Sequence, residues 1–346
     1  FVLLPAFGVR TTIIIAAAVN LIVGVVAITA QRQPIERASV EPSVVTMDQN
    51  PFWFFAAIAS GFVTISTQVS WTRIITMVIG SSTYAFSIVV ALFLIGLAGG
   101  AWFIGRKDRS TTVRRTVTVV ELLTTVSLFA SLFVVNWLPW LLVNLGTNLH
   151  ISSWAGLLGL QVVCATLLIL VPALLMGMVM PLVLVWATSD PVKGVARVGR
   201  AYAVNTIGAI AGAFLTGFVL IPKTSTKFAL VLSAVVCVVV AGLAYQPAAT
   251  DRDPALRRSL AIGAIPIVVL LMIVLTPRMN LVDLSVGAYD TLVRVLAQTR
   301  EGTAAQNNGE STAPSVHQLL MYEEGATATV SVRKDEETIS MAINGR

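Results

Sequence analysis

The fold of this chain is decided by the stretch Arg197–Pro222, RVGRAYAVNTIGAIAGAFLTGFVLIP, which opens with basic residues and continues as an apolar run of membrane-spanning length. Gly208 and Gly212 recur within it at helical spacing, and in lipid such small-residue faces let two helix backbones pack closely. Asn205 lies among them, and a polar amide in hydrocarbon normally faces a neighbouring helix or a cavity. We therefore expect a tightly packed membrane helix whose partners carry small residues of their own, such as Gly96 to Gly100.

The composition indicates a membrane protein. Of the 346 residues, 56% are hydrophobic and 12% are charged, whereas a soluble domain carries roughly 25% charged residues. These values predict an all-α polytopic membrane protein in contact with the lipid bilayer. The net charge of +6 comes from basic residues in short loops between apolar segments, so it indicates membrane orientation and no nucleic-acid partner. Cys164 and Cys237 lie inside apolar runs, and we expect neither a disulfide framework nor a metal site.

The apolar runs that reach the ~20 residues of a spanning helix number about eight. They are roughly Thr11–Ala30, Phe52–Val78, Tyr84–Gly105, Thr116–Leu138, Trp154–Ala187, Ala201–Ile221, Lys227–Tyr245 and Ser259–Thr276. The fifth run is too long for one perpendicular span. We expect that Pro172 and Pro181 kink it, that its end lies along the interface, or that the prolines mark a broken helix beside a cavity.

The loops alternate in charge. Basic residues crowd the loop after the third run and return in the loops after the fifth and seventh, and these loops should be cytoplasmic. The loop Pro139–Ser153 carries no Lys or Arg and should lie outside. Trp137, Trp140 and Trp154 flank it, as an interfacial aromatic belt would.

A short sequence motif that occurs twice indicates an internal repeat. FVLIP at Phe218–Pro222 has a near copy, FVLLP, at Phe1–Pro5, and each copy precedes a polar link and one apolar helix. We interpret residues 1–30 as the last helix of an earlier repeat, residues 31–51 as a cytoplasmic linker and residues 52–245 as a complete six-helix repeat. Two parallel six-helix repeats are the plan of major-facilitator-type transporters. The alternative is a chance match between two aliphatic runs that end in proline.

The chain becomes polar after a connecting membrane helix at residues 259–276. Residues 277–346 begin as a linker, within which Glu301–Ser315 is rich in small and polar residues. Thr327–Val332 and Thr338–Ile343 then alternate like two strands joined by a charged turn, which predicts a β-hairpin. One hairpin buries too little surface to be stable alone, so we expect a soluble domain that continues past Arg346.

A series of short motifs follows one another along nearly the whole chain. They are WTR at Trp71–Arg73, GSSTYAF at Gly80–Phe86, FLIGL at Phe93–Leu97, PALLMG at Pro172–Gly177, AYAVNTIGA at Ala201–Ala209, SVGAY at Ser285–Tyr289, YEEG at Tyr322–Gly325 and TVSV at Thr329–Val332. Together they resemble the bacterial fused membrane/spermidine-synthase proteins, in which a major-facilitator-like helical part precedes an aminopropyltransferase-like domain.

The resemblance implies a role in polyamine biosynthesis, by aminopropyl transfer from decarboxylated S-adenosylmethionine to putrescine, and a multi-pass location in a bacterial inner membrane. The family's nucleotide loop and catalytic acids would follow Arg346, so we expect no catalytic residue and no cofactor site within this chain. Two positions depart from the family pattern. Gln68 stands where the family has Glu, and Ala328 stands where soluble synthases have a Gln that helps bind the nucleoside.

Five polar residues are candidates for contact with a substrate, each with a structural alternative. Glu121 is the only acid in the fourth run and suits proton coupling or a cationic amine, or it is a neutral group bonded to a neighbouring helix. Arg73 snorkels to the interface, pairs with a partner or contacts substrate. Gln68 and Asn205 are interhelical hydrogen-bonding groups or ligands. Tyr322 lies where a synthase-like hairpin approaches its substrate, or it packs.

The sequence leaves three functions open. They are the membrane part of a polyamine aminopropyltransferase, a transporter of a small cationic or amine solute, and a membrane anchor without transport. Alternating spans place residues 277–346 outside the cell, whereas an enzyme with a nucleoside substrate is expected in the cytoplasm. Either the eighth run is re-entrant, or the fifth crosses twice, or the tail is not a conventional synthase.

Overall fold

The computed structural model describes residues 3–30, 51–80, 83–106, 113–149, 151, 153–189, 194–247, 253–280, 284, 292, 318–335 and 338–344. The chain divides into two units, Phe1–Thr46 and Met47–Arg346. The first unit holds α1, and the second holds all other elements. The predicted linker at residues 31–51, apart from Pro51, and the polar run Glu301–Ser315 lie outside the described residues.

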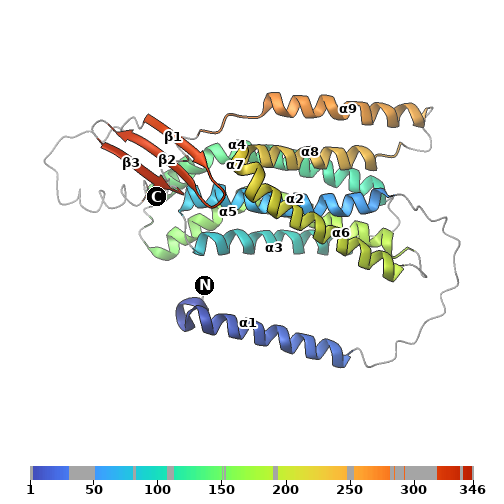
Figure 1. The fold of residues 1–346 in the computed structure, drawn as a ribbon, viewed down its shortest axis with the longest axis horizontal. Coiled ribbons are helices and arrows are strands. Elements are labelled where there is room, and N and C mark those ends of the chain that lie inside the picture. Colours follow the sequence, from blue (N-terminus) through green and yellow to red (C-terminus); the bar gives the residue numbers. More distant parts are fainter. Residues whose placement is uncertain are drawn as a thin grey trace. The chain divides into compact units, whose positions relative to one another are not determined.

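Eight helices in the described part of the chain are long and apolar enough to cross a membrane (Figure 1), which confirms the predicted all-α polytopic membrane protein. They are α1 (Leu3–Ala30), α2 (Phe52–Ile79), α3 (Thr83–Gly105), α4 (Val113–Asn148), α5 (Trp154–Ala187), the segment Gly194–Lys223 that holds α6 and α7, α8 (Thr226–Ala244) and α9 (Pro254–Leu275). Large apolar side chains such as Ile95 and Leu167 point outward and are more than half exposed, as a lipid-facing surface requires.

The helix of the first unit, α1, is apolar along most of its length and buries none of its spanning window. Gly8 interrupts it near its start with a φ of 72°. Glycine takes this left-handed conformation readily because it has no Cβ.

The fourth helix is longer than the sequence indicated. α4 continues through Pro139 and ends at Asn148, so the predicted outside loop Pro139–Ser153 is wrong for most of its length. A proline removes one backbone hydrogen bond, but packing within a helix bundle can offset that loss. Leu138 and Leu142 are both buried around the proline, so tertiary contacts hold the helix on each side of it.

The fifth helix, α5, is continuous over 34 residues and contains both Pro172 and Pro181. Its length of about 51 Å exceeds the ~30 Å hydrocarbon core, so it tilts or extends past the core at one end. One continuous helix also removes the alternative that this run crosses the membrane twice.

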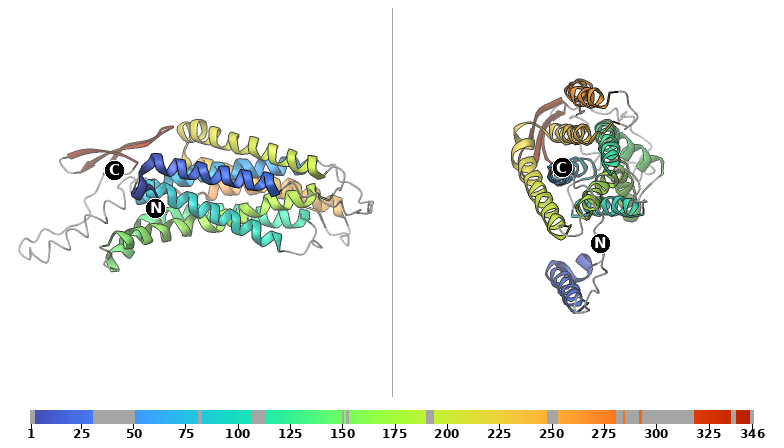
Figure 2. Two further views of the ribbon diagram at one scale, coloured as in Figure 1. Left: turned by 90° about the horizontal axis from the view of Figure 1, so that it is seen from below. Right: turned by 90° about the vertical axis from the view of Figure 1, so that its right-hand side faces the viewer.

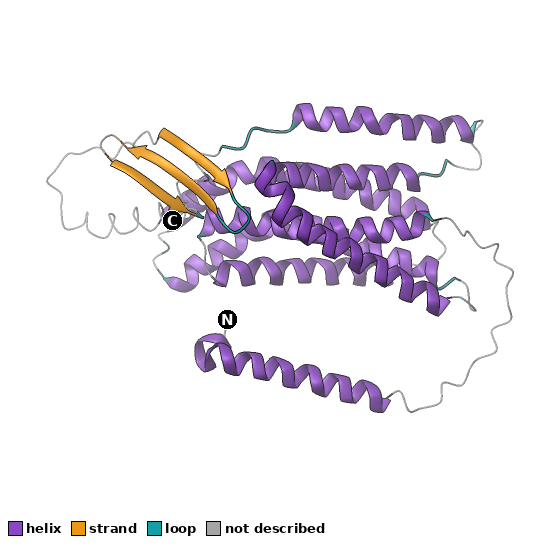
Figure 3. Cartoon of the chain, in the orientation of Figure 1, coloured by secondary structure: helices purple, strands orange, loops and turns teal. Residues whose placement is uncertain are grey.

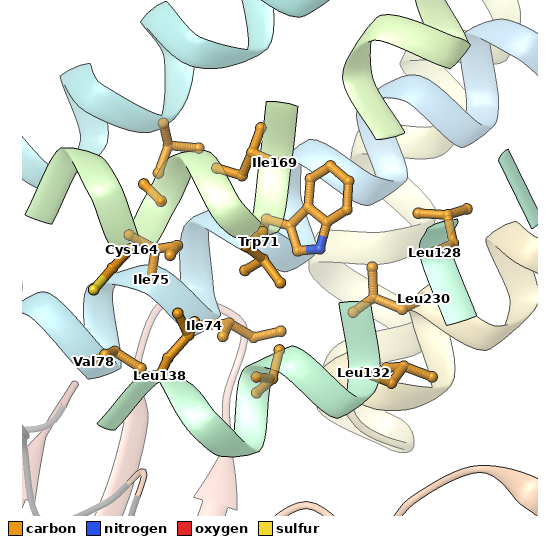
Figure 4. Close-up of a cluster of buried hydrophobic side chains, with 14 of the residues drawn as sticks. Trp71, Ile74, Ile75, Val78, Leu128, Leu132, Leu138, Cys164, Ile169 and Leu230 are labelled. Atoms are coloured by element: carbon orange, nitrogen blue, oxygen red, sulfur yellow. The ribbon is translucent and has the colours of Figure 1, made fainter. Parts of the chain in front are cut away.

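The central helix of the second unit is α2. It contacts α3, α4, α5, α6 and α8, and the end-on view in Figure 2 shows it among these helices. Two buried clusters hold it. Trp71 lies in one with Leu128 and Leu230 (Figure 4), and Trp53 stacks on Trp186 in the other with ring centroids 5.5 Å apart. Packing on several sides fixes the directions in which the other side chains of α2 point.

The glycines of the membrane helices make close helix–helix contacts, as their spacing predicts. Gly208 and Gly212, however, contact α2 and not the helix that carries Gly96 and Gly100. They lie on α6 (Gly194–Phe214), and an added Cβ at either position would clash with backbone atoms of α2, at Ile58 for Gly208. Gly96 and Gly100 of α3 instead face α5. The expected pairing of this helix with Gly96 to Gly100 is therefore wrong, because a small-residue face sets how closely helices approach and not which helix approaches.

The chain after α6 is a π-helical segment, η1 (Leu215–Leu220), followed by the short α7 (Ile221–Lys223). Thr216 of this segment donates a hydrogen bond to Ser66 Oγ of α2 at 2.7 Å. Ser233 Oγ of α8 lies 3.1 Å from the same oxygen. This buried hydroxyl cluster joins three segments of the bundle.

The C-terminal residues form a three-stranded antiparallel sheet in the order β1-β2-β3 (Figure 3), which confirms the predicted small β region. Its strands are β1 (Gln318–Glu324), β2 (Thr329–Asp335) and β3 (Thr338–Ile343). β3 has the predicted bounds, and β2 begins two residues after the predicted Thr327. The sequence did not predict β1. This strand pairs with β2 across an irregularity between Leu319 and Met321, and its exposed and partly buried residues do not alternate regularly.

Candidate functional site: a polar seam along α2

Five polar residues of α2 recur at every fourth position, Ser60, Thr64, Gln68, Thr72 and Thr76. Residues four apart lie on one face of an α-helix, and we call this row the polar seam. Polar side chains inside membrane helices face the bundle interior or a water-filled space and often mark the path of a polar solute. Three cavities in the described part of the chain lie along the seam, and each has a seam residue in its wall.

The Glu121 cavity lies among α2, α4, α5 and α8 and has a volume of about 10 Å³, which is room for about one water molecule. Glu121 is 3% exposed, and its carboxyl group is hydrogen-bonded with the Cys237 thiol of α8. Ser60 and Thr64 of the seam line the same cavity. The acid that the sequence singled out therefore lies deep in the bundle and beside the seam.

The Asn205 cavity lies among α2, α3, α5 and α6 and has a volume of about 300 Å³. Asn205 and Tyr202 contribute to its wall from α6, and Gly177 and Pro181 contribute from α5. The Asn205 amide Nδ2 donates to the Ala57 carbonyl oxygen of α2 at 3.0 Å. The amide of Asn205 therefore joins two helices and also lines a cavity, whereas its role as a ligand stays a prediction.

These two cavities share a wall made by Ser60, Thr64 and Met176. Two of the three residues carry hydroxyl groups, and the third is a flexible thioether side chain. The small cavity with the acid and the large cavity with the amide are therefore direct neighbours.

The Arg73 cavity lies where α2 meets the sheet and has a volume of about 630 Å³. Gln68 and Arg73 line it from the helix, Thr327 lines it from the turn between β1 and β2, and Asn344 lines it from just after β3. It shares Ile65 with the Asn205 cavity, so the cavities follow one another along α2 toward the sheet.

The sheet is docked on this end of α2 through Arg73. Its Nη1 donates to the Gly325 carbonyl oxygen at 2.6 Å, and its Nη2 donates to the Ala326 carbonyl oxygen. Both carbonyls belong to the turn between β1 and β2. A guanidinium is suited to such paired contacts because its N–H groups form a planar fork.

Glu324 forms a second docking contact, at the start of α8. Its Oε2 accepts from the backbone N–H of Thr226 at 2.6 Å and from the Thr226 hydroxyl at 2.5 Å. A carboxylate is stabilised at a helix N-terminus by the free N–H groups and the helix dipole. Tyr322 completes the contact, since its hydroxyl donates to Glu324 Oε1 at 3.2 Å and lies 3.5 Å from the Met77 sulfur of α2.

The electrostatics of Tyr322 reflect this position. Burial, followed by the nearby Glu324 carboxylate and its hydrogen bond, raises the pKa of Tyr322 above the ordinary tyrosine value, while Arg73 acts in the opposite direction. Burial and the contacts with Glu324 both disfavour the charged phenolate. The hydroxyl therefore keeps its proton and remains a donor while the sheet is docked.

The sheet lies at the end of the bundle opposite the most basic loop. It contacts the last turns of α2 and the first turn of α8, whereas Arg106 follows the far end of α3. The positive-inside rule then predicts that the sheet is outside. Because α5 and α9 are each one continuous helix, neither supplies the second crossing or the re-entrant turn that would move the tail inside.

The structure brings three of the predicted candidates together at the sheet, namely Gln68, Arg73 and Tyr322, and places Glu121 and Asn205 in the two neighbouring cavities. Sequence reasoning missed the small hydroxyl residues of the seam and Glu324. The spacing of four residues between the polar side chains of α2 was a signal in the sequence that could have identified the seam. Nothing local in the sequence pairs Glu324 with Thr226, which is 98 residues away.

The residues that the structure describes contain no group of three or more His, Cys, Asp or Glu side chains that could hold a metal ion. Comparisons of the chain with protein-family models, curated proteins and solved structures gave no match. The resemblance to fused membrane/spermidine-synthase proteins therefore stays a prediction. The chain is shown to be a multi-pass membrane protein with a small C-terminal sheet docked on its helices.

Proposed function

We propose that this chain is the membrane part of a bacterial inner-membrane protein that handles polyamines, and that its helices bind and move a small cationic amine along the polar seam. One observation carries the proposal, namely the succession of cavities beside the seam, with Glu121 next to the Asn205 cavity of about 300 Å³. An alkyl diamine is compact enough for about 300 Å³ and would place its ammonium groups against the oxygens of Ser60, Thr64 and Asn205.

The test is uptake of labelled putrescine by full-length protein in proteoliposomes. Thr64→Val removes a seam hydroxyl from the cavity walls and is expected to lower uptake several-fold. Thr206→Val is the matched control, because its hydroxyl is exposed and bonds only within α6. No saturable uptake by folded wild-type protein, or equal loss in both variants, would refute transport along the seam.

The second candidate is aminopropyl transfer by a soluble domain that begins with the sheet, and the order of motifs from Trp71–Arg73 to Thr329–Val332 favours it. Under this proposal the putrescine nitrogen attacks the aminopropyl carbon next to the sulfonium of decarboxylated S-adenosylmethionine. The C–N bond forms, the C–S bond breaks, methylthioadenosine leaves and a proton is released. The helices would then hold the enzyme at the membrane. Formation of spermidine and methylthioadenosine by the full-length protein tests this candidate.

The side of the membrane separates the two candidates. Glu323 is exposed on β1, and the two native cysteines are buried, so Glu323→Cys gives a single accessible thiol in the described part of the chain. Labelling of intact cells by a membrane-impermeant maleimide is expected if the sheet is outside. Labelling only after permeabilisation would place the sheet with cytoplasmic nucleoside substrates and favour the enzyme.

A further inference from the structure

The Glu121 cavity combines an acid with surroundings that cannot balance a negative charge. α2, α5 and α8 pack against α4 around it, and its wall contains the aliphatic side chains Val63, Val179 and Val236. The titratable group that these helices present to Glu121 is the Cys237 thiol, and no cation of the described residues lines the cavity. An ionised carboxylate is strongly disfavoured in such a place, and a buried acid without a counter-ion therefore holds its proton.

The size of the cavity decides which ligand can exchange there. About 10 Å³ holds about one water molecule and not an ammonium group with its alkyl chain. The Asn205 cavity, at about 300 Å³, has the room that the Glu121 cavity lacks. The wall between them is made by Ser60, Thr64 and Met176, so a charge in the larger cavity acts on Glu121 across hydroxyl groups and one side chain.

We propose that Glu121 is a proton-binding site and that a cationic amine in the Asn205 cavity displaces its proton. The Glu121 carboxyl group gives up H⁺ through the Ser60 and Thr64 hydroxyls, and the carboxylate left behind is stabilised by the ammonium group next door, because charges attract strongly in a low-dielectric interior. When the amine leaves, a proton returns to the carboxylate. Proton and amine therefore alternate, which makes the movement an exchange of one cation for another. This inference rests on the proposed transport function.

Glu121→Gln is the informative variant, because glutamine has nearly the same shape and mimics the protonated acid. The experiment measures putrescine binding to purified full-length protein at two pH values one unit apart, and proton release into weakly buffered solution on binding. We expect wild-type affinity to rise about tenfold per pH unit where Glu121 is protonated in the empty protein, with release of one proton for each site filled. The variant is expected to bind with an affinity independent of pH and to release none.

A second measurement does not depend on putrescine. Dicyclohexylcarbodiimide modifies protonated carboxyl groups in apolar surroundings, so mass spectrometry should find wild-type protein modified at Glu121, and modified less when putrescine is present. Glu323→Gln on the exposed sheet is the control and should behave as wild type in both measurements.

The outcomes separate the two ideas. Binding of putrescine with the same pH dependence and proton release in wild type and Glu121→Gln would overturn the exchange and leave amine binding intact. Failure of folded wild-type protein to bind putrescine would overturn the proposed function and the exchange with it. An unmodified Glu121 in protein that does bind putrescine would overturn the proton site alone.

Discussion

Replacing Gly208 by alanine tests how closely α2 and α6 approach. An added Cβ would lie 2.8 Å from the carbonyl carbon of Ile58 and closer still to its oxygen, whereas ordinary contact begins at 3.4 Å. No change of rotamer relieves this clash, because the atoms on both sides are fixed to backbone. The contact with the oxygen is the closer of the two, so α6 must retreat from α2 by about an ångström.

The cost follows from the atoms that lose contact. Each pair of carbon atoms at optimal separation contributes ~0.1–0.2 kcal/mol, and a gap of about 0.5–1 Å removes a quarter to a half of that energy. Over a few tens of atom pairs along the two helices, the free energy of unfolding falls by about 1–3 kcal/mol, which is the range found for overpacked cores. The hydrogen bond from Asn205 to Ala57 joins the same helices and would be strained by the same shift.

The matched control is Gly199→Ala on α6, where the added Cβ has no atom within 4 Å beyond its own stretch of helix. This change only replaces a poor helix former, so stability should rise slightly or stay the same. Both variants are unfolded reversibly in mixed detergent micelles with the full-length protein as reference. Equal midpoints for Gly208→Ala and Gly199→Ala would show that the two backbones are not in contact, and the reasoning would be refuted.

Three further predictions concern the docked sheet and the bundle. Glu324→Ala should weaken docking of the sheet on the helices by about 1–2 kcal/mol, because the N-terminus of α8 loses its capping carboxylate. Amide hydrogen exchange in β1 should then become faster, and an unchanged exchange rate would contradict the contact between Glu324 and Thr226. Docking raises the pKa of Tyr322, so above the ordinary tyrosine pKa of about 10 the hydroxyl keeps its proton in the docked state and loses it in the undocked state. Docking should therefore weaken as the pH rises above about 10, and Tyr322→Phe should remove this part of the pH dependence. Ser66→Ala should lower bundle stability by about 1 kcal/mol, since Thr216 loses its partner; a change as small as that of an exposed serine would argue against the hydroxyl cluster.

The membrane helices could be predicted well because hydrophobic runs of spanning length leave few alternatives. α5 begins and ends at the predicted Trp154 and Ala187. α4 was misjudged because Pro139 resembles a helix end, and only the buried neighbours Leu138 and Leu142 explain why the helix continues. Local pattern therefore identifies where hydrocarbon is crossed, while tertiary packing decides where a helix stops.

The candidate site could be predicted only as separate residues. Glu121 and Asn205 were identified because polar groups in apolar runs are conspicuous, yet the wall that joins their cavities depends on Met176, which no polar pattern marks. Arg73 was assigned three alternatives, and the structure gives it backbone carbonyls about 250 residues away as partners. Contacts at that sequence separation follow from the assembled fold, and single-sequence patterns do not encode them.

The close pairing of α2 with α6 also constrains how the protein is made. α2 is synthesised long before its partner, because the hydrogen bond between them links residues 148 positions apart. Until α6 emerges, the backbone around Ile58 lacks its final neighbour, and Ser60 and Thr64 lack the α6 side of their cavity. Bare lipid is a poor solvent for these hydroxyl groups. α2 is therefore sheltered during membrane insertion by the insertion machinery or by α3 and α5, until Gly208 and Gly212 of α6 and then α8 complete its packing.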